Sequence, residues 1–281
     1  QRMSKHNTWY IDPQTGSFVQ ATHSAMRLRM NTSSDETLRK ALFDWSTASA
    51  CDFAKDYIQL VQRRNEYARK AWYKDFYDYK AQTEERMTSD EIFSLFDSLT
   101  SKLKGFHAKM REEEKSMPWL RQPRNFGYMM SWDFIKEENE YFPLQSMVEV
   151  WWRSFAALWI DYRWSKMQLD LLERSGKYNN WFCHAPTAIH YDKDGKRVAW
   201  QTNFTCTAIP GEVWSGFNAW NCLFHEGWHA AHFSNMDQQD VILNTEYQPQ
   251  SSSWAETHSM FLDTMYDSID WKTRYAANLE W

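Results

Sequence analysis

Glycine is scarce in this chain, with 8 residues among 281, whereas tryptophan is abundant, with 17. Sharp turns use glycine most readily, because a residue without a Cβ atom adopts left-handed backbone conformations at no steric cost. A chain with few glycines therefore favours long helices over a turn-rich β architecture. We expect a mostly α-helical protein in which residues 1–281 form a single domain.

The overall composition excludes several classes of protein. Hydrophobic residues make up 43% and charged residues 25%, which is typical of a globular chain. The net charge is -5 and there is no concentrated basic block, so we expect no nucleic-acid partner. The longest apolar stretch, around residues 155–160, is too short to span a bilayer, so we expect no membrane partner.

The cysteines bear on the compartment in which the protein works. They form no C-x-x-C pair and no dense framework, and they are Cys51, Cys183, Cys206 and Cys222. Scattered cysteines of this kind are typical of reduced thiols. We therefore expect a cytoplasmic or mitochondrial-matrix protein.

Apolar residues recur at helical spacing in several segments, often just after residues that cap helices. Residues 1–31 lack this pattern and are expected to form an irregular or partly extended lead-in. The spacing predicts two helices over 38–79, with a break near 46–52, and another helix over 88–114. Further helices are predicted over 144–164, 212–233 and 251–266.

One segment is predicted to be β. Extended stretches over 187–190 and 198–207 flank the turn Asp192-Lys193-Asp194-Gly195, whose Asp-Gly pair is a good local signal for a hairpin. The sequence therefore predicts a β-hairpin over 187–207 within a mostly α fold.

The run His225-Glu226-Gly227-Trp228-His229 matches H-E-x-x-H inside a segment predicted to be helical. Residues four apart lie on one face of a helix, so His225 and His229 can bind one metal ion. Two histidines and a glutamate would be costly to bury in an apolar helix without a metal ion or partners. Zinc lowers the pKa of a bound water towards neutrality, and Glu226 can take its proton as the water attacks a carbonyl. We expect one Zn2+ per chain, with Glu226 as the general base.

The third ligand decides the class of zinc site. The longer pattern H-E-x-x-H-x-x-G-x-x-H fails, because His232 and Asn235 stand where glycine and histidine are needed. Two acidic residues remain as candidates, Glu246 in a predicted loop and Glu256 in a predicted helix. A helix holds a ligand in place better than a loop does, so Glu256 is preferred. Asp263 follows seven residues later on the same helix face and either supports a ligand or belongs to an ordinary acidic surface.

Four further segments of the sequence carry short motifs that accompany the H-E-x-x-H motif. They are Ser131-Trp132-Asp133, Glu140-Tyr141-Phe142-Pro143-Leu144, Leu169-Asp170 with Arg174-Ser175-Gly176-Lys177, and Ala255-Glu256-Thr257-His258-Ser259-Met260-Phe261. In this order they resemble the W-D, Y-F-P-L, L-D…R-x-G-K and A-E-x-x-S-x-F elements of the zinc metallopeptidases typified by thimet oligopeptidase and oligoendopeptidase F. The resemblance runs from about residue 35 to the end of the chain.

This resemblance implies a function and a fold. It implies His225, His229 and Glu256 as zinc ligands, Glu226 as the general base, and His232 as a further histidine of the family that supports the site without binding zinc. The implied fold is a zincin-like helical bowl whose deep channel admits short peptides and excludes folded proteins. The implied function is hydrolysis of peptide bonds in short peptides. A β edge beside the zinc pairs with the substrate backbone in such enzymes, and residues 201–207 are either that edge or a plain structural hairpin.

The chain departs from the family pattern at three places. Trp228 and Trp72 each stand where the family has glycine. Family members also continue past the end of this match, where a histidine and a tyrosine stabilise the oxyanion of the reaction. Either a further chain or segment supplies that part, or the catalytic machinery is incomplete. The alternative reading is a catalytically inactive, peptidase-like subunit of a larger assembly.

Overall fold

The computed structural model describes residues 8–131, 137–187, 189–236 and 252–276. It divides into two compact units. Unit 1 combines Gln1–Thr8 and Gln20–Thr32 with Ser131–Trp281, and unit 2 combines Trp9–Val19 with Ser33–Met130. The sequence predicts that residues 1–281 form a single domain. Whether the two units together make up one domain stays a prediction.

Unit 2 is built mainly of helices. Its elements are β1 (Trp9–Ile11), β2 (Phe18–Gln20), α2 (Glu36–Lys70), α3 (Phe76–Glu84), α4 (Ser89–Lys102), α5 (Lys104–Ser116), the 3-10 helix η2 (Pro118–Arg121) and α6 (Pro123–Ser131).

The helix boundaries in unit 2 differ from those expected. Helix α2 runs without interruption through 46–52, so the break predicted there is wrong. The chain breaks at Ala71 instead, where α2 ends. Thr88 caps α4 in a reciprocal capping box with Glu91, which confirms the predicted start of that helix. The helix expected to continue to residue 114 is divided at Leu103 into α4 and α5.

Unit 1 contains a helical layer and a small sheet. Its elements are α1 (His23–Thr32), η3 (Asn139–Tyr141), η4 (Leu144–Ser146), α8 (Met147–Ala157), β3 (Lys166–Leu172), β4 (Phe182–Thr187), β5 (His190–Tyr191), β6 (Arg197–Val198), β7 (Gln201–Ala208), α9 (Ser215–Asn235), α10 (Ser252–Tyr266) and α11 (Ile269–Tyr275).

Three expectations for unit 1 are corrected here. The lead-in over 1–31 is not irregular throughout, because α1 begins at His23. The helix expected over 144–164 is only α8, which ends at Ala157, and strands β3 and β4 lie in a stretch for which no strand was predicted. The chain is nevertheless mostly helical with small sheets, as the scarcity of glycine predicts.

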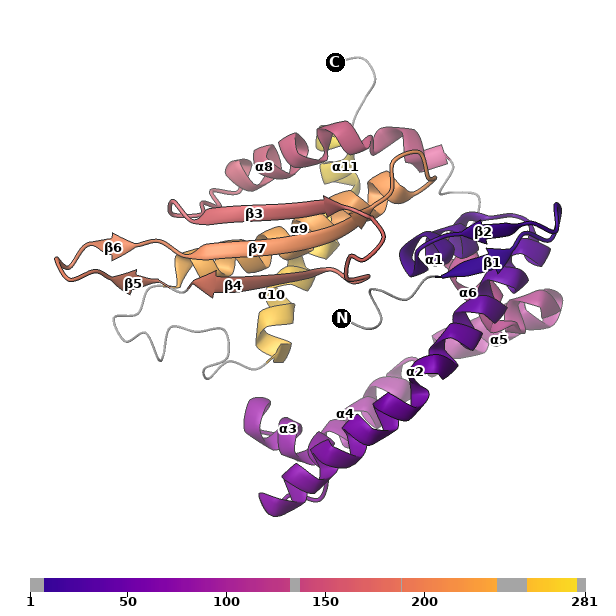
Figure 1. Ribbon diagram of the computed structural model, residues 1–281, viewed down its shortest axis with the longest axis horizontal. Helices are drawn as coiled ribbons and strands as arrows, with labels where there is room; N and C mark the ends of the chain where they lie inside the picture. The colour runs from indigo at the N-terminus through magenta and orange to yellow at the C-terminus, as the bar shows by residue number, and fades with distance from the viewer. Residues whose placement is uncertain (1–7, 132–136, 188, 237–251, 277–281) are drawn as a thin grey trace. The chain divides into compact units, whose positions relative to one another are not determined.

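The main sheet has the strand order β3-β7-β4 (Figure 1). Strand β7 pairs with β3 in parallel and with β4 in the antiparallel sense, so Phe204 stands opposite both Leu169 and Cys183. The turn at Gly195 joins β5 to β6, an antiparallel pair that extends the β4–β7 arm within the segment expected to form a hairpin. Because β7 is paired on both sides, it offers no free edge.

Helix α9 lies along one face of this sheet and α8 and α10 pack against it (Figure 1). The core between these elements is rich in aromatic side chains, including Trp151 of α8, Phe204 of β7, and Trp220 and Phe224 of α9. A Cβ atom on Gly227 would lie 2.3 Å from Nε1 of Trp151, so the glycine is what allows α8 to approach α9. The core therefore fixes the position of the helix that carries the H-E-x-x-H motif.

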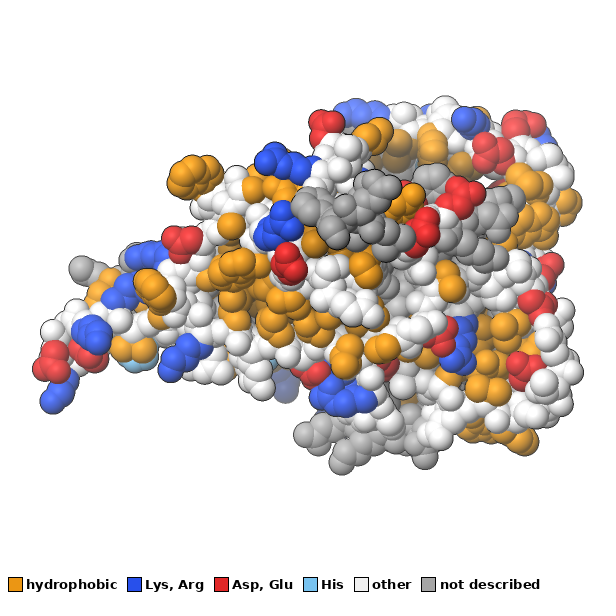
Figure 2. All heavy atoms as spheres, turned by 90° about the horizontal axis from the view of Figure 1, so that it is seen from above, with side chains coloured by type: hydrophobic (Ala, Val, Ile, Leu, Met, Phe, Trp, Pro, Cys, Tyr) orange, Lys and Arg blue, Asp and Glu red, His pale blue; other side chains and the backbone are white. Residues whose placement is uncertain are grey.

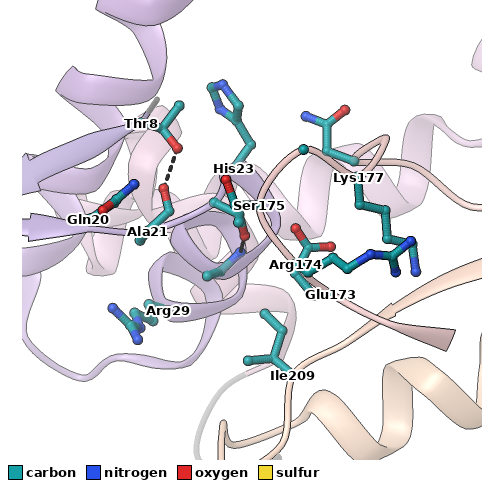
Figure 3. Close-up of a pocket in the computed structure, with 14 residues that line it drawn as sticks. Thr8, Gln20, Ala21, His23, Arg29, Glu173, Arg174, Ser175, Lys177 and Ile209 are labelled. Carbon is teal, nitrogen blue, oxygen red and sulfur yellow. Dashed lines mark hydrogen bonds between the residues drawn. The ribbon is translucent and has the colours of Figure 1, made fainter. Parts of the chain in front are cut away.

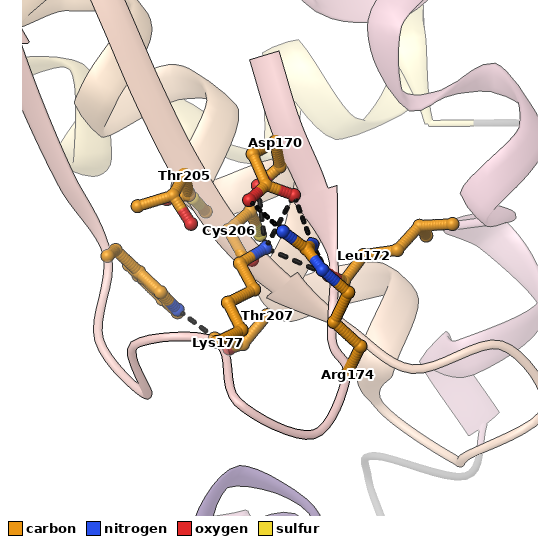
Figure 4. A network of polar contacts seen from close by, with 9 residues as sticks. Asp170, Leu172, Arg174, Lys177, Thr205, Cys206 and Thr207 are labelled. Carbon is orange, nitrogen blue, oxygen red and sulfur yellow. Dashed lines mark hydrogen bonds and ion pairs between the residues drawn. The ribbon is translucent and has the colours of Figure 1, made fainter. Parts of the chain in front are cut away.

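A polar network secures the loop after β3 (Figure 4). Arg174 forms two hydrogen bonds with the carboxylate of Asp170, at 2.6 and 2.8 Å. The ammonium group of Lys177 donates to the backbone carbonyls of Asp170, Leu172 and Cys206. The L-D…R-x-G-K segment thus ties β3 and the following loop to β7. Its charged residues therefore have a structural role that does not depend on catalysis.

The surface and the cysteines complete the description. In Figure 2, which looks onto the side of unit 1 that carries α8, hydrophobic side chains reach the surface. The largest exposed ones at α8 include Trp152, and Trp159 follows its C-terminal end. The four cysteines are free thiols. Among the described helices, none is both long enough and apolar enough to cross a membrane.

Candidate metal centre

Helices α9 and α10 bring the predicted zinc ligands together. The Nε2 atoms of His225 and His229 lie 3.2 and 3.5 Å from Oε2 of Glu256. One ligand atom from each residue lies within 4.8 Å of the others. His225 and His229 are one turn apart on α9, and Glu256 faces them from the first half of α10.

The spacing of these atoms can be compared with that of a zinc site. Zinc binds histidine nitrogen and carboxylate oxygen at about 2.0–2.2 Å in tetrahedral geometry, which separates two ligand atoms by about 3.3 Å. Both measured nitrogen-to-oxygen distances are close to this edge length. The two-histidine, one-glutamate set is also one of the sets that catalytic zinc sites use, with a position left for water or substrate. The residues present therefore fit the ion.

Two further contacts orient the ligands. Nδ1 of His225 lies 3.0 Å from Oδ2 of Asp263, so in the tautomer that donates its Nδ1–H hydrogen bond to this carboxylate, Nε2 is free to bind a metal ion. The hydroxyl of Ser259 donates to Oε2 of Glu256 at 3.0 Å. Asn221 donates to Oδ1 of Asp263 at 3.3 Å. Asp263 thus contacts a predicted ligand, as its predicted supporting role requires.

Glu226 lies in the same helix but in a more enclosed place. Only 4% of its surface is exposed, although it is the neighbour of His225 in the chain. Burial raises the pKa of its carboxyl to about 7, against the opposing charge of His225. A backbone hydrogen bond from Cys183 of β4 also reaches it. A carboxyl with a pKa near neutrality can both accept and return a proton at physiological pH.

The two histidine ligands differ in their protonation. Burial lowers the pKa of His229 to about 4, so its imidazole is neutral near pH 7 and its lone pair is free. Burial also disfavours the charged form of His225, but the hydrogen bond and charge of Asp263 outweigh it and raise the pKa. A metal ion must therefore compete with a proton more strongly at His225 than at His229.

The remaining candidates lie around this group. His232 is half-buried beside His258, with ring centroids 5.2 Å apart, and burial followed by the charge of His258 lowers its pKa. It is not one of the three converging ligands. Cys222 is fully buried in the core, where its thiol contacts the carbonyl of Thr205. Glu246, the alternative third ligand, and Trp132-Asp133 lie outside the described residues.

The sequence missed two residues of this site and misplaced one element. Asn221 lies one turn before His225 and could have been found from its i, i+4 spacing. Ser259 is part of the A-E-x-x-S-x-F segment, but no role was expected for it. Residues 201–207, for which a substrate-pairing edge and a plain structural hairpin were both open, form β7, the central strand, so the edge alternative is wrong. Among the described strands, the outer one beside Glu226 is β4.

The cavity of unit 1 shown in Figure 3 lies at a different place. It measures about 440 Å³ and is lined by residues that include His23, Arg29, Glu173 and Arg174. None of the six candidate site residues lines it. The candidate metal centre is therefore separate from this cavity.

Comparison with known proteins adds no identification. No protein-family model matches the chain, and no curated protein matches it either. The argument for function consequently depends on the residues and the geometry of the site.

Proposed function

We propose that this chain is a zinc-dependent oligopeptidase with a zincin-like fold, which hydrolyses peptide bonds of short peptides. The observation that carries the proposal is the convergence of His225, His229 and Glu256 beside the buried carboxyl of Glu226. The resemblance to the thimet oligopeptidase and oligoendopeptidase F family supplies the substrate class.

Each residue has a role in this mechanism. His225, His229 and Glu256 would hold the ion, which would polarise the scissile carbonyl and lower the pKa of water in its open position. Glu226 takes the proton of the attacking water and returns it to the leaving amine, which suits a carboxyl whose pKa lies near 7. Asp263 keeps the imidazole of His225 in the tautomer that presents Nε2.

The substrate is best placed along β4. This strand lies at the edge of the described sheet, and its residue Cys183 contacts Glu226 through the backbone. An extended peptide can add to such an edge by main-chain hydrogen bonds, which are independent of the substrate sequence. This mode corrects the expectation for residues 201–207 and keeps the scissile bond near the general base.

One observation favours the inactive alternative. The indole N–H of Trp228 is buried without a hydrogen-bond partner directly before a predicted zinc ligand, where the resembling family has glycine. A ligand helix with such an unsatisfied buried group would hold the fold without supporting catalysis. A peptidase-like subunit of a larger assembly would then be the function.

The deciding experiment is Glu226→Gln, assayed with a quenched-fluorescent short peptide and by elemental analysis for zinc. The enzyme proposal expects hydrolysis to fall by several orders of magnitude while about one zinc per chain remains bound. His229→Ala is the control that should lose both. Hydrolysis by the Glu226→Gln protein at the wild-type rate would reject the mechanism. Zinc binding without hydrolysis in the wild-type protein would favour the alternative.

A further inference from the structure

Asn221 occupies a position that links the metal centre to α9. It lies four residues before His225, so both side chains are on the same face of the helix. Its amide donates to Oδ1 of Asp263 at 3.3 Å, while Nδ1 of His225 lies 3.0 Å from Oδ2 of the same carboxylate. Asp263 is thus held by α9 at both of its oxygens.

We propose that Asn221 is a positioning residue of the metal centre, which acts on His225 through Asp263. The proposal depends on the metal site of the proposed function, but it does not require that the site hydrolyse peptides. The hydrogen bond from Asn221 to Asp263 involves no change in covalent bonds or charge. The amide of Asn221 only fixes the orientation of a carboxylate.

The physical argument concerns the freedom of the Asp263 carboxylate. An aspartate side chain rotates about two bonds, and a single hydrogen bond to His225 leaves the carboxylate plane free to turn. An amide NH2 group can only donate, so it pairs with the second oxygen and fixes the plane. The imidazole that this carboxylate holds then keeps Nε2 aimed at Oε2 of Glu256, 3.2 Å away.

Loss of the amide should weaken metal binding. Removing an outer partner of a metal-binding histidine typically lowers metal affinity by about 10–100-fold. Asn221 is one step further out than Asp263, so the expected loss is near the lower end, about tenfold. Asp263→Ala should cost more than Asn221→Ala.

The experiment measures zinc affinity by competition with a chromophoric chelator, without any peptide. Asn221→Ala should bind zinc about tenfold more weakly than the wild type. Asn221→Asp keeps the shape but cannot donate to Asp263, so it should lose at least as much affinity. Asn218→Ala is the matched control, since Asn218 also lies on α9 but lines a different cavity. Its zinc affinity should not change.

The outcomes separate this inference from the proposed function. Circular dichroism of the metal-free variants checks that each one folds, and Asn221→Asp covers the case in which Asn221→Ala does not. Wild-type zinc affinity in both Asn221 variants would overturn the inference even if the protein is a peptidase. Zinc binding that depends on Asn221 in a protein without peptidase activity would reject the function and leave the inference standing.

A separate observation concerns four tryptophans with left-handed backbone. Trp72, Trp159, Trp164 and Trp214 have φ values of 68°, 59°, 64° and 69°. Such a conformation costs a residue with a side chain about 1–2 kcal/mol. The first three are 95–96% exposed, so their rings gain nothing from packing.

The local structure at these positions is the kind that glycine forms. After α2 the N–H groups of Trp72 and Tyr73 donate to the carbonyls of Arg69 and Ala68, which is the Schellman pattern with Trp72 in the glycine position. Trp159 has the same place after α8, where the donors are Trp159 and Ile160.

Trp164 lies in a different glycine position. It is the third residue of a turn closed by the N–H of Ser165 and the carbonyl of Tyr162, at 2.8 Å. Both central residues have positive φ, as in the type I′ turns that favour Asn-Gly.

We infer that the gene of this protein specifies glycine at 72, 159, 164 and 214, through a codon that some genetic systems read as tryptophan and others as glycine. The inference also accounts for a chain with 17 tryptophans and 8 glycines. Tryptophans such as Trp220 and Trp271 belong to a different group. They are buried, and their indoles donate to Pro143 and Ser154.

Peptide mass spectrometry of the protein isolated from the organism that makes it tests this inference. Glycine at the four positions and tryptophan at 220 and 271 is the expected result. In the gene, the four positions should share one codon that differs from the codon at 220 and 271. Tryptophan at the four positions in the isolated protein would overturn the inference.

Discussion

Glu226 is the residue whose ionisation the fold changes in the direction that the proposed mechanism needs. Glu226 is a buried residue of α9 with only 4% of its surface exposed, and this burial raises the pKa of its carboxyl to about 7. The same burial lowers the pKa of His229 to about 4. Burial thus favours the neutral forms of both Glu226 and His229. Neutral side chains cost less free energy to bury than charged ones, so the helix can hold both residues when no metal ion is bound.

This shift predicts how the stability of the metal-free protein depends on pH. Between about pH 4.5 and 7 the folded state holds a proton on Glu226 that the unfolded state has lost, so the free energy of unfolding falls as pH rises. The total effect is on the order of 3 kcal/mol. Glu226→Gln lacks this titration. Its stability advantage over the wild type should grow from pH 5 to pH 8.

Urea unfolding of both proteins at the two pH values, in the presence of a chelator, measures the difference. Glu256→Gln is the matched control, because its carboxylate is half exposed. An advantage of Glu226→Gln that is the same at pH 5 and pH 8 would show that Glu226 is ionised throughout this range.

The sequence predicted most residues of the metal centre at this scale. The i, i+4 spacing identified His225 and His229, and the helical context favoured Glu256 and Asp263. Asn221 and Ser259 were not predicted, because their roles depend on how α10 lies against α9, and side-chain contacts between helices are not encoded in local spacing.

At the scale of elements, the C-terminal end of α2 contains a residue that its backbone disfavours. Trp72 has φ of 68° and is 96% exposed. For the chain with tryptophan at 72, we expect Trp72→Gly, which restores the residue inferred for the gene, to raise the free energy of unfolding by about 1 kcal/mol, because glycine removes the steric cost of the left-handed conformation. Trp72→Ala is the control, since it removes the ring but keeps the Cβ atom. Chemical denaturation should rank Gly above Ala, and equal stability of the two variants would contradict the argument.

The contact between α8 and α9 predicts the opposite effect for a glycine in a helix. Exchange of a mid-helix glycine for alanine normally stabilises a helix by about 0.5–1 kcal/mol. In Gly227→Ala the new Cβ atom would lie 2.3 Å from Nε1 of Trp151 and 2.7 Å from its Cε2. We therefore expect a loss of about 1–3 kcal/mol.

Gly105 provides the matched control for this prediction. It lies in α5, and a Cβ atom there would meet nothing within 4 Å. Gly105→Ala should therefore stabilise the protein, and thermal unfolding compares the two changes directly. A stabilising Gly227→Ala would mean that α8 and α9 are not in close contact.

Element boundaries were harder to predict than element types. The apolar pattern of 38–79 shows its helices, but α2 continues through 46–52 because no residue there breaks a helix. Strand β3 escaped prediction, since it is stabilised by parallel pairing with β7, from which it is separated by 28 residues (172 to 201 in the chain). Such pairing is a long-range interaction that a local pattern does not report.

At the scale of the molecule, the metal centre belongs to one of two compact units. All three predicted ligands lie in unit 1, and helices α2 to α5 lie in unit 2. A ligand that binds only the folded state stabilises the part of the structure that forms its site. Zinc should therefore protect unit 1 against local opening more than unit 2.

Hydrogen–deuterium exchange with and without zinc tests this expectation. Peptides from α9 and α10 should exchange several-fold more slowly when zinc is bound, while peptides from α2 and α4 should change little. His229→Ala is the control in which zinc has no effect. Equal protection of both units would show that they unfold as one cooperative body.

The sequence by itself determined the helical character of this protein and identified most residues of its candidate metal centre. Few glycines favoured helices, capping residues marked where α4 begins, and the four-residue spacing of His225 and His229 placed these two residues on one face of a helix, with Glu226 next to His225 in the chain. These features are local, because a residue's backbone preferences and its helical neighbours are fixed within a few positions in the chain.

Only the tertiary structure decided which groups meet. It placed Glu256 against both histidines, Asp263 between His225 and Asn221, and β4 at the edge beside Glu226. It also buried Glu226 deeply enough to move its pKa to about 7. These properties arise from the packing of α8, α10 and the sheet around α9, and burial and pairing over long distances in the chain depend on all of these elements at once.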